Sequence, residues 1–550
     1  MIKSLVTGVA MLCLSLTTIA KDIYVHPDVN IVKDNEYHYN PPGSSAISID
    51  VLPGDRLILQ GRTDKSRSHI TLVNLQGTKD NPIIVTHPTG DYVNINTVNT
   101  YGIHLNNSEH VIIDGGRNAV LRDNPLFYGI QIRIGDKGQS IKADNGSNFV
   151  QIKRVWIEVP LHIQDNSKAP AIVVKSNKQC FQGKERYTEN TFLMQDLLIK
   201  DNKIENAGSE AIYIGETGGP DSTKCGGSIR LDLDFNYYTG ELLNIEPVSV
   251  SDEVKVLRPH LLDNVIIEGN VINNPGWDGI QLSNCHNFQV RDNSIYNYGT
   301  KNENSQKSGI IIGEGCSGDV YNNIIDLGSG WAIFTKPAGN LWIYNNIIHR
   351  SGQTGGMTNS SHCAIYALAE NLSLSYNKGK NAIGPKTINI NHNLITRSVG
   401  HGVRINSSIK DVQKAKELSA ITFANVIANV IVENGGVPID NQFNELNYNY
   451  GLSLIYNPNH IYGSLAQAKM TNTNGADSRL WDVRPALGSP LIDKAPPLRE
   501  NIEKPDIYGQ KRGPFSTSAK INQIKGAGLQ ADFGPAERIL PIITLDLPLR

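Results

Sequence analysis

Residues 267 to 348 contain four copies of one pattern: Ile-Glu-Gly-Asn270-Val-Ile, Val-Arg-Asp-Asn293-Ser-Ile, Val-Tyr-Asn-Asn323-Ile-Ile and Ile-Tyr-Asn-Asn346-Ile-Ile. In each copy an asparagine stands two residues before an isoleucine and follows alternating apolar positions. Further copies are Ile-Lys-Asp-Asn202-Lys-Ile, Ile-Asn-His-Asn393-Leu-Ile and the weaker Ile-Ala-Asn429-Val-Ile. Neighbouring copies are 23 residues apart from 270 to 293 and from 323 to 346, and 30 apart from 293 to 323. A repeat of about 22 residues with insertions at the turns explains these spacings.

Short strands of period two, separated by Gly and Asn turns at this repeat length, predict a coil of parallel strands. Each coil is expected to stack about 4.8 Å from the next, so that inward Ile, Val and Leu form apolar rows and the turn asparagines stack along the axis. An amphipathic helix does not fit, because the segments are β-branched, rich in Asn and interrupted by Gly. The leucine framework of a leucine-rich horseshoe is absent. The predicted fold is therefore an all-β parallel β-helix.

The two ends of the chain resemble secreted bacterial right-handed β-helix proteins of the pectate-lyase-like superfold. The resemblance at the start rests on Gly54-Asp-Arg-Leu-Ile-Leu59, Gly77-Thr78 with Asn81-Pro-Ile83, and Gly102-Ile103 through Val111-Ile-Ile-Asp-Gly115. At the end it rests on Ser489-Pro-Leu-Ile-Asp493, Asp506-Ile-Tyr-Gly509 and Asp532-Phe-Gly534. The resemblance implies a single-stranded right-handed solenoid with loop insertions and an irregular C-terminal tail. It leaves the reaction open, because the superfold hosts lyases, hydrolases, epimerases and adhesins.

The first 20 residues have the pattern of a cleavable signal peptide. Lys3 is followed by an apolar run from Leu5 to Leu16 that is too short to span a bilayer, and then by the small-residue exit Thr18-Ile19-Ala20. We expect a secreted or periplasmic protein with no membrane span; an uncleaved N-terminal anchor is the alternative. The expected organisation is a signal peptide at 1–20, a cap with the first coils at 21–100, the β-helix core at 101–440 with a loop excursion at 216–262, and a C-terminal tail at 441–550 that packs on the helix.

The charge balance argues against a nucleic-acid partner. Lys and Arg number 51 against 53 Asp and Glu, a net charge of −2, so an acidic ligand has to be bound by local cations. Calcium-dependent pectate lyases contain clustered Asp residues, and no tight cluster of this kind is found in the sequence. We therefore expect no required cofactor and no metal site, with calcium left open, and a monomeric protein.

Five cysteines follow the signal peptide, at positions 180, 225, 285, 316 and 363, and none is in a C-x-x-C pair of the zinc-binding kind. Cys180 and Cys225 lie in loop-like sequence, where a disulfide bond between them is plausible in an oxidising compartment. Cys285 and Cys316 are predicted near the same turn of adjacent coils, as a cysteine ladder or a bridge.

Counting from the asparagines gives the register of the following strand. The inward positions are Ile212, Ile280, Ile310, Ile333, Ile365 and Val403. Three outward columns flank them. The first column is Glu210, Asp278, Ser308, Trp331, Cys363 and His401. The second column is Tyr213, Gln281, Ile311, Phe334, Tyr366 and Arg404, and the third is Gly215, Ser283, Gly313, Lys336, Leu368 and Asn406.

Aromatic side chains on an outward strand face suggest platforms for sugar rings. The predicted ligand is an extended polysaccharide or oligosaccharide, bound by Tyr213, Gln281, Trp331, Phe334 and Tyr366. Insertions at 216–262, 299–308 and 350–363 flank this face, as walls of a binding groove do. The alternative is that these insertions fold over the face and bury the aromatic rings as ordinary packing.

Glu210 and Asp278 share the first column. If 216–262 is an excursion, the two acids lie on adjacent coils about 5 Å apart at the backbone. Two carboxyl groups this close raise one pKa and can divide into an acid and a nucleophile or base. The sequence therefore favours hydrolysis of glycosidic bonds with Glu210 and Asp278 as the catalytic pair; solvated or turn-stabilising acids are the alternative.

A uronate-directed lyase is the second hypothesis, with Lys336, His401 and Arg404 as the catalytic cations and Tyr366 nearby. Asp278-Gly-Ile and Gly400-His401-Gly402 resemble fragments of polygalacturonase motifs, but four coils, roughly 19 Å, separate them. The paired-aspartate motif expected between them is also missing, so that family's roles are not carried over. A third hypothesis is a glycan-binding β-helix without catalytic activity.

Overall fold

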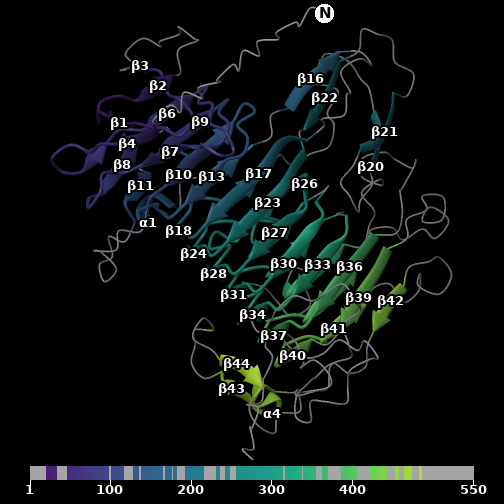
Figure 1. The fold of residues 1–550 in the computed structure, drawn as a ribbon. Helices are drawn as coiled ribbons and strands as arrows, with labels where there is room; N and C mark the ends of the chain where they lie inside the picture. Colours follow the sequence, from purple (N-terminus) through teal and green to yellow (C-terminus); the bar gives the residue numbers. More distant parts are fainter. Residues whose placement is uncertain are drawn as a thin grey trace, which may run out of the picture.

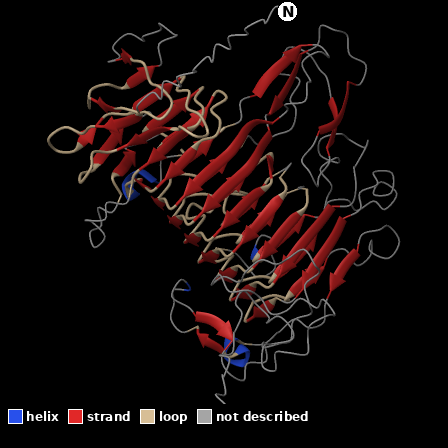
Figure 2. Cartoon of the chain, in the orientation of Figure 1, coloured by secondary structure: helices blue, strands red, loops and turns tan. Residues whose placement is uncertain are grey.

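The computed structural model describes residues 20–33, 46–97, 101–116, 128–134, 138–164, 168–175, 178–182, 192–215, 231–235, 242–247, 255–259, 261–313, 316–336, 339–354, 362–368, 386–406, 422–427, 429–441, 453–456, 464–473, 478 and 482–485. The chain winds through three parallel sheets, named A, B and C below, and each coil contributes one short strand to A, then C, then B (Figures 1 and 2). The expected right-handed parallel β-helix is confirmed.

Three strand ladders run the length of the stack. Sheet A contains β1 (Asp22–Val25), β4 (Arg56–Leu59), β7 (Ile83–Thr86), β10 (Val111–Asp114), β13 (Gln151–Lys153), β17 (Phe192–Lys200), β23 (Leu261–Glu268), β27 (Phe288–Arg291), β30 (Gly318–Tyr321), β33 (Leu341–Tyr344), β36 (Lys386–Asn391), β39 (Thr422–Ile427) and β42 (Ser453–Tyr456), with β26 (Cys285–His286) beside β23. Sheet B contains β3 (Ala46–Ser48), β2 (Ile31–Lys33), β6 (Ile70–Val73), β9 (Ile103–Asn106), β12 (Ile141–Asp144), β15 (Ile172–Val174), β19 (Ile212–Ile214), β25 (Ile280–Leu282), β29 (Ile310–Ile312), β32 (Ile333–Thr335), β35 (Ile365–Leu368), β38 (Val403–Asn406) and β41 (Ile439–Asn441). Sheet C contains β5 (Ser66–Arg67), β8 (Val93–Thr97), β11 (Ile130–Ile134), β14 (Val155–Glu158), β18 (Lys203–Glu205), β24 (Val271–Asn273), β28 (Ser294–Tyr296), β31 (Ile324–Asp326), β34 (Ile347–His349), β37 (Leu394–Thr396) and β40 (Val430–Val432).

The remaining elements lie outside these sheets. They are the antiparallel pairs β16 (Lys178–Gln182) with β22 (Lys255–Pro259), β20 (Leu231–Phe235) with β21 (Leu242–Pro247) and β43 (Met470–Asn472) with β44 (Asp482–Pro485), and the helices α1 (Leu161–Gln164) and α4 (Leu465–Ala468). Between β19 and β23 the chain leaves the stack through β20, β21 and β22, while Ile212 pairs directly with Ile280. The segment is therefore an excursion and not an extra coil.

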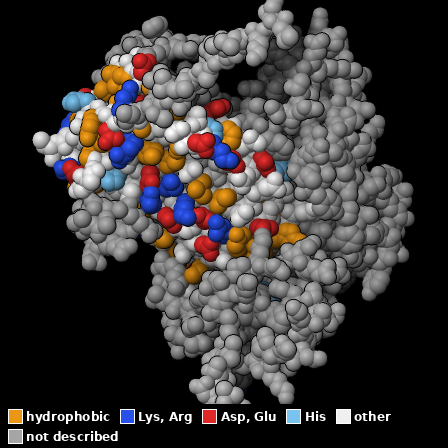
Figure 3. Space-filling view, viewed as in Figure 1, with side chains coloured by type: hydrophobic (Ala, Val, Ile, Leu, Met, Phe, Trp, Pro, Cys, Tyr) orange, Lys and Arg blue, Asp and Glu red, His pale blue; other side chains and the backbone are white. Residues whose placement is uncertain are grey.

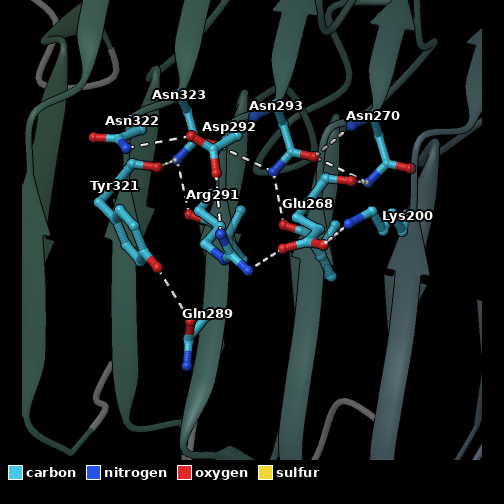
Figure 4. A network of polar contacts seen from close by, with 12 residues as sticks. Lys200, Glu268, Asn270, Gln289, Arg291, Asp292, Asn293, Tyr321, Asn322 and Asn323 are labelled. Atoms are coloured by element: carbon cyan, nitrogen blue, oxygen red, sulfur yellow. Dashed lines mark hydrogen bonds and ion pairs between the residues drawn. The ribbon is translucent and has the colours of Figure 1, made fainter. Parts of the chain in front are cut away.

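The repeated asparagines form the predicted ladder at the turn between sheets A and C. The Asn293 amide nitrogen donates to Asn323 Oδ1 at 3.0 Å, and the Asn270 amide nitrogen donates to Asn293 Oδ1 at 2.9 Å (Figure 4). Equivalent bonds join the other members of the series Asn202, Asn270, Asn293, Asn323, Asn346, Asn393 and Asn429. Each side chain is at most 1% exposed, so the amides satisfy backbone groups that water does not reach.

The residue before each ladder asparagine from Asn202 to Asn393 adopts a left-handed backbone. Asp292, Asn322 and Asn345 have φ of 56°, and Gly269 has φ of 67°. Asp, Asn and Gly tolerate this conformation better than other residues do, because their short side chains bond locally or are absent. The Asp-Asn and Asn-Asn pairs of the repeat therefore encode a sharp turn followed by a buried amide.

A column of small residues lies between the inward isoleucines and the first outward column of sheet B. Its members are Gly102, Ser140, Ala171, Ala211, Gly279, Gly309, Ala332, Ala364 and Gly402. A Cβ added at Gly309 meets Ile325 Cγ2 at 2.6 Å and the Ala332 carbonyl oxygen at 2.7 Å. The close packing of neighbouring coils therefore excludes larger side chains at this position.

Gly309→Val is expected to lower the free energy of unfolding by about 1–3 kcal/mol, because the added side chain overpacks the core. Gly309→Ala adds the Cβ alone and is expected to cost less than valine. Denaturant titration of both variants measures the effect. An unchanged midpoint for Gly309→Val contradicts the packing argument.

The cysteine prediction is confirmed as a ladder and not as a bridge. Cys285 and Cys316 are buried free thiols, and the Cys285 backbone N–H donates to Cys316 Sγ at 3.5 Å. Burial raises the pKa of the Cys285 thiol well above its ordinary value, which keeps it uncharged. Cys225 lies outside the described residues, as does the side chain of Cys180, and so does the predicted signal peptide except for Ala20.

Segments from the C-terminal region pack on sheet C and on the last coils. β42 pairs with β39, and the Leu465 N–H at the start of α4 donates to Glu433 Oε1 at 2.9 Å. The Ser478 hydroxyl donates to Asp326 Oδ2 at 2.8 Å, where Arg350 and His349 also contact the same carboxylate. These contacts neutralise the buried charge of Asp326.

Candidate functional site

The predicted register of sheet B is confirmed by its strand pairing. Tyr213 pairs with Gln281, Gln281 with Ile311, Ile311 with Phe334, Phe334 with Tyr366, and Tyr366 with Arg404. The second outward column is therefore continuous along one face, and the first and third columns run beside it. The same register extends toward the N-terminus through Val173, Lys142 and His104.

Glu210 and Asp278 lie on adjacent coils, as expected. The Ala211 N–H donates to the Asp278 carbonyl at 3.0 Å, which places the two acids side by side in the first column. Asp278 is completely buried, and Glu210 is 5% exposed. Asp278 Oδ1 accepts a hydrogen bond from the Ser308 backbone N–H, whereas Asp278 Oδ2 has no hydrogen-bond partner among the described residues.

The carboxyl groups of this pair are hard to ionise. Burial raises the pKa of Glu210, and the Ser209 hydroxyl and the Lys175 charge only partly oppose it. Burial, followed by repulsion from Glu210, raises the pKa of Asp278 well above its ordinary value. The hydrogen bond from the Ser308 N–H and the positive charge of Lys336 act in the opposite direction. Two neighbouring carboxyl groups that resist ionisation keep a proton to higher pH than free carboxyl groups do, which is a property that a general acid requires.

Polar groups surround the acid pair. Gln281 in the second column and Ser283 in the third are 3% and 2% exposed, and Gln281 Oε1 and Ser283 Oγ are buried atoms with no hydrogen-bond partner among the described residues. The Lys175 ammonium lies 5.1 Å from the ring centroid of Tyr213. Buried polar atoms without partners are uncommon in native proteins and mark this region as a place where further polar groups can bind.

The aromatic residues of the columns stack on one another. The ring centroids are 4.5 Å apart for Trp331 and Phe334, and 5.4 Å apart for Phe334 and Tyr366. Trp331 and Phe334 are each 7% exposed, and Tyr213 is 9% exposed. The expectation that these rings stand exposed on the face is therefore wrong: they are buried, and Trp331 and Phe334 pack against each other and against Ile311 and Cys363. Tyr366 is half-buried and is the more accessible ring.

His401 and Arg404 form a separate group at the far end of the face. His401 Nε2 lies 3.5 Å and Arg404 Nε 3.4 Å from Asp440 Oδ2. The Arg404 guanidinium lies over the Tyr366 ring at 5.9 Å. Four coils separate this group from Asp278, as predicted, so only Lys336 of the three lyase cations acts electrostatically on Asp278.

Sequence reasoning missed a second polar group on the same face. Tyr101, His104, Lys142 and Asp144 lie on β9, β12 and the turn before β9, at the N-terminal end of the three columns. The available signal was Gly102-Ile103, which repeats Gly279-Ile280 and Gly309-Ile310 and extends the columns backward. Because no ladder asparagine precedes this copy, counting from the asparagines does not reach it.

On sheet A, oppositely charged side chains form direct ion pairs along the face. Lys200 pairs with Glu268 at 2.5 Å, Arg291 contacts the same carboxylate, and Arg154 pairs with Asp114 (Figure 4). Positive and negative side chains are interleaved on the face seen in Figure 3. This face presents a balanced charge pattern.

Within the described part of the chain, no group of three or more His, Cys, Asp or Glu side chains is arranged to hold a metal ion. The same residues contain no helix long and apolar enough to cross a membrane.

No protein-family model matches the chain, and no curated protein matches it. Among solved structures it is similar to a GH136 lacto-N-biosidase from Eubacterium ramulus, with 12% identity and a TM-score of 0.44 over 76% of this chain and 68% of the other. It is also similar to an alginate lyase from a Paenibacillus species, with 13% identity and a TM-score of 0.31 over 75% and 93% of the two chains. A mutant of the periplasmic alginate epimerase AlgG gives 11% identity and a TM-score of 0.30 over 75% and 77%. Similarities this remote do not indicate what this chain binds.

Proposed function

We propose that the protein is a glycan-cleaving enzyme that hydrolyses glycosidic bonds on the face of sheet B, with Asp278 and Glu210 as its catalytic pair. The observation that supports this proposal most directly is the placement of two buried carboxyl groups on adjacent coils. Stability alone gives no reason to bury an unpaired carboxyl oxygen such as Asp278 Oδ2, because desolvation of a polar atom without a partner is costly. Titratable groups whose pKa is shifted by burial are concentrated at active sites.

The two acids have different roles in this proposal. Asp278, whose pKa is raised well above its ordinary value, protonates the leaving oxygen as the glycosidic bond breaks. The Lys175 charge opposes the rise in the pKa of Glu210, so Glu210 ionises more readily than Asp278. Glu210 therefore attacks the anomeric carbon as the nucleophile. Water then releases the sugar while Asp278 takes back a proton. Adjacent coils lie about 4.8 Å apart. The two carboxyl groups are about 5–5.5 Å apart in retaining glycosidases and about 6.5–9.5 Å apart in inverting ones, so the coil spacing favours the retaining mechanism.

The test is a screen of the full-length protein on neutral, uronic and sulfated polysaccharides, with reducing ends and ultraviolet absorbance both measured. Hydrolysis releases reducing ends without new absorbance, and proton NMR of the first product is expected to show retained anomeric configuration. Absorbance from an unsaturated 4,5-sugar instead identifies the lyase alternative, with Lys336, whose charge acts on Asp278, as the neutralising cation. Binding to polysaccharide gels without any cleavage contradicts catalysis and leaves a glycan-binding β-helix.

The acid pair also predicts how stability depends on pH. Because the pKa values of Glu210 and Asp278 are raised on folding, the folded state binds more protons than the unfolded state above pH ~4. The stabilisation is complete below the unfolded pKa and is lost as pH rises through the folded pKa. Asp278→Asn removes this loss and is therefore expected to unfold at a higher denaturant concentration than the wild type at neutral and alkaline pH. Identical pH–stability curves for the two proteins are the contradicting result.

A further inference from the structure

Tyr101, His104, Lys142 and Asp144 contact one another in a closed polar ring. His104 Nε2 lies 2.7 Å from Asp144 Oδ1, and the Lys142 ammonium is ion-paired with Asp144 Oδ2. The Lys142 ammonium also donates to the Tyr101 hydroxyl at 3.2 Å, and the rings of Tyr101 and His104 are 4.7 Å apart. The side chains of His104, Lys142 and Asp144 are 11%, 17% and 9% exposed. The four residues are therefore held rigidly by one another while Tyr101 and Lys142 keep some surface accessible.

This ring lies in the same three columns as the acid pair. Gly102 N–H donates to the Gln139 carbonyl at 3.0 Å and Ala171 N–H donates to the Glu210 carbonyl at 3.1 Å, so Tyr101 belongs to the first column. His104 and Lys142 continue the second column, and Asp144 the third. Three coil steps, from β9 through β12 and β15 to β19, separate Tyr101 from Glu210, a distance of about 14 Å along the axis. An extended chain that occupies the acid pair reaches this ring without turning.

The ring offers hydrogen-bond donors toward a ligand. An ammonium group has three N–H donors, and among the described residues Lys142 uses two, on Asp144 and Tyr101. The Tyr101 hydroxyl accepts from Lys142, so its own O–H is left to donate, and no described residue accepts it. One ammonium N–H and one phenol O–H thus lie side by side, the arrangement that a two-oxygen anionic group accepts from.

The lysine and the aspartate of the ring are both ionised. The Lys142 ammonium and Nε2 of His104 both contact the Asp144 carboxylate, whereas the Lys175 ammonium on the next coil lies over the Tyr213 ring. Burial lowers the pKa of Lys142, but the contacts with Asp144 outweigh burial and raise it. Burial raises the pKa of Asp144, but His104 and Lys142 outweigh burial and lower it. Both groups are therefore charged at neutral pH, and the remaining N–H of Lys142 is a charged hydrogen-bond donor.

We propose that Tyr101 and Lys142, held in place by Asp144 and His104, form a second binding site that accepts the anionic group of a sugar about three coils away from the acid pair. The anionic group is a uronic carboxylate or a sulfate, both of which accept hydrogen bonds through two oxygens. The site implies that the substrate of the proposed enzyme is an anionic glycan, and in this respect the inference rests on the proposed function. Binding in the absence of cleavage is nevertheless measurable by itself.

The chain contains a matched control for a purely structural role. Lys203 lies 4.4 Å from the centroid of the Trp156 ring and 2.9 Å from Glu205 Oε2. This arrangement resembles that of Lys142, which contacts the Tyr101 ring and an acid two residues later, Asp144. This group lies on β14 and β18 of sheet C, outside the columns of sheet B. A lysine that only covers an aromatic ring and balances an acid is expected to behave alike at both places.

The experiment is affinity electrophoresis of full-length proteins that carry Glu210→Gln and Asp278→Asn to prevent cleavage. The gels contain polygalacturonate, alginate, dextran sulfate or neutral dextran. The reference double variant is expected to be retarded by uronate gels or by dextran sulfate, and the responding gel identifies the anion. Adding Lys142→Met is expected to weaken that affinity by about tenfold or more, and Tyr101→Phe by about three- to tenfold, the loss of a charge-assisted and of a neutral hydrogen bond. Adding Lys203→Met is expected to leave the affinity unchanged.

Unchanged affinity after both Lys142→Met and Tyr101→Phe overturns the proposal, and so does an equal loss caused by Lys203→Met. Retention by neutral dextran alone, or by none of the gels, also counts against it. If Lys142→Met unfolds the protein, Tyr101→Phe decides the question, because it removes one hydroxyl and keeps the ring. If the wild type binds an anionic gel but releases no sugar, the proposed hydrolysis is refuted and this site is retained. If the wild type cleaves a polysaccharide and Lys142→Met leaves binding unchanged, only this site is refuted.

Discussion

Asp278→Asn is expected to reduce the release of reducing ends by about 10²–10⁴-fold, because the amide has no proton to give to the leaving oxygen. The substitution keeps the shape of the side chain and its Oδ1, so the hydrogen bond from the Ser308 N–H is retained. The loss therefore reports the missing proton and not a displaced coil. It is measured as the initial rate on the polysaccharide that responds best in the screen.

Asp292→Asn is the matched control for this prediction. Asp292 lies in the turn after β27, its side chain is 43% exposed, and Asn tolerates its left-handed backbone of φ 56°. Its activity is expected to equal that of the wild type. Full activity in Asp278→Asn removes the site assignment, whereas a comparable loss in Asp292→Asn points to a general effect of the substitution on the protein.

Asn293→Ala is expected to lower the free energy of unfolding by about 3–6 kcal/mol, the largest stability effect that the fold predicts. The side chain accepts from the backbone and amide nitrogens of Asn270, and donates to Asn323 Oδ1 and to the Ile267 carbonyl. Because the site is 1% exposed, water does not replace these four partners after truncation. Denaturant titration followed by far-ultraviolet circular dichroism measures the change.

Asn425→Ala provides the comparison within the same protein. Asn425 lies on the outward side of β39 and donates a single side-chain hydrogen bond, to Asn389 Oδ1 at 2.7 Å. Its truncation is expected to cost about 1 kcal/mol or less. A ladder asparagine that proves no more sensitive than Asn425 contradicts the view that the buried amides hold the coils together.

Much of the candidate site is predictable because the repeat carries its own register. Asn202 and Asn270 are each followed after nine residues by the small residue that precedes the strand of sheet B, so alignment of these two asparagines is enough to place Glu210 beside Asp278. The same counting locates Tyr213, Gln281 and Arg404 in one column. Side-chain identity along a period-two strand decides which residues point outward together.

The environment of those residues is not predictable in the same way. Burial of Trp331 and Phe334 depends on residues of other coils, such as Ile311 and Cys363. The local pattern therefore assigns both side chains to an outward face but does not predict that they are buried there. The pairing of Arg404 and His401 with Asp440 joins residues of two coils. The ring of Tyr101, His104, Lys142 and Asp144 escapes prediction for a related reason, since the asparagine ladder used for counting begins only at Asn202.

The sequence by itself determined the coil repeat, the inward and outward columns and the adjacency of Glu210 and Asp278, because these follow from a repeated pattern that stays recognisable where coils carry insertions. Only the tertiary structure decided which outward side chains are buried, which carboxyl groups have a raised pKa and which lysines are paired with an acid. These properties depend on distances and solvent exclusion between coils. They arise from the stack as a whole, and no single repeat encodes them.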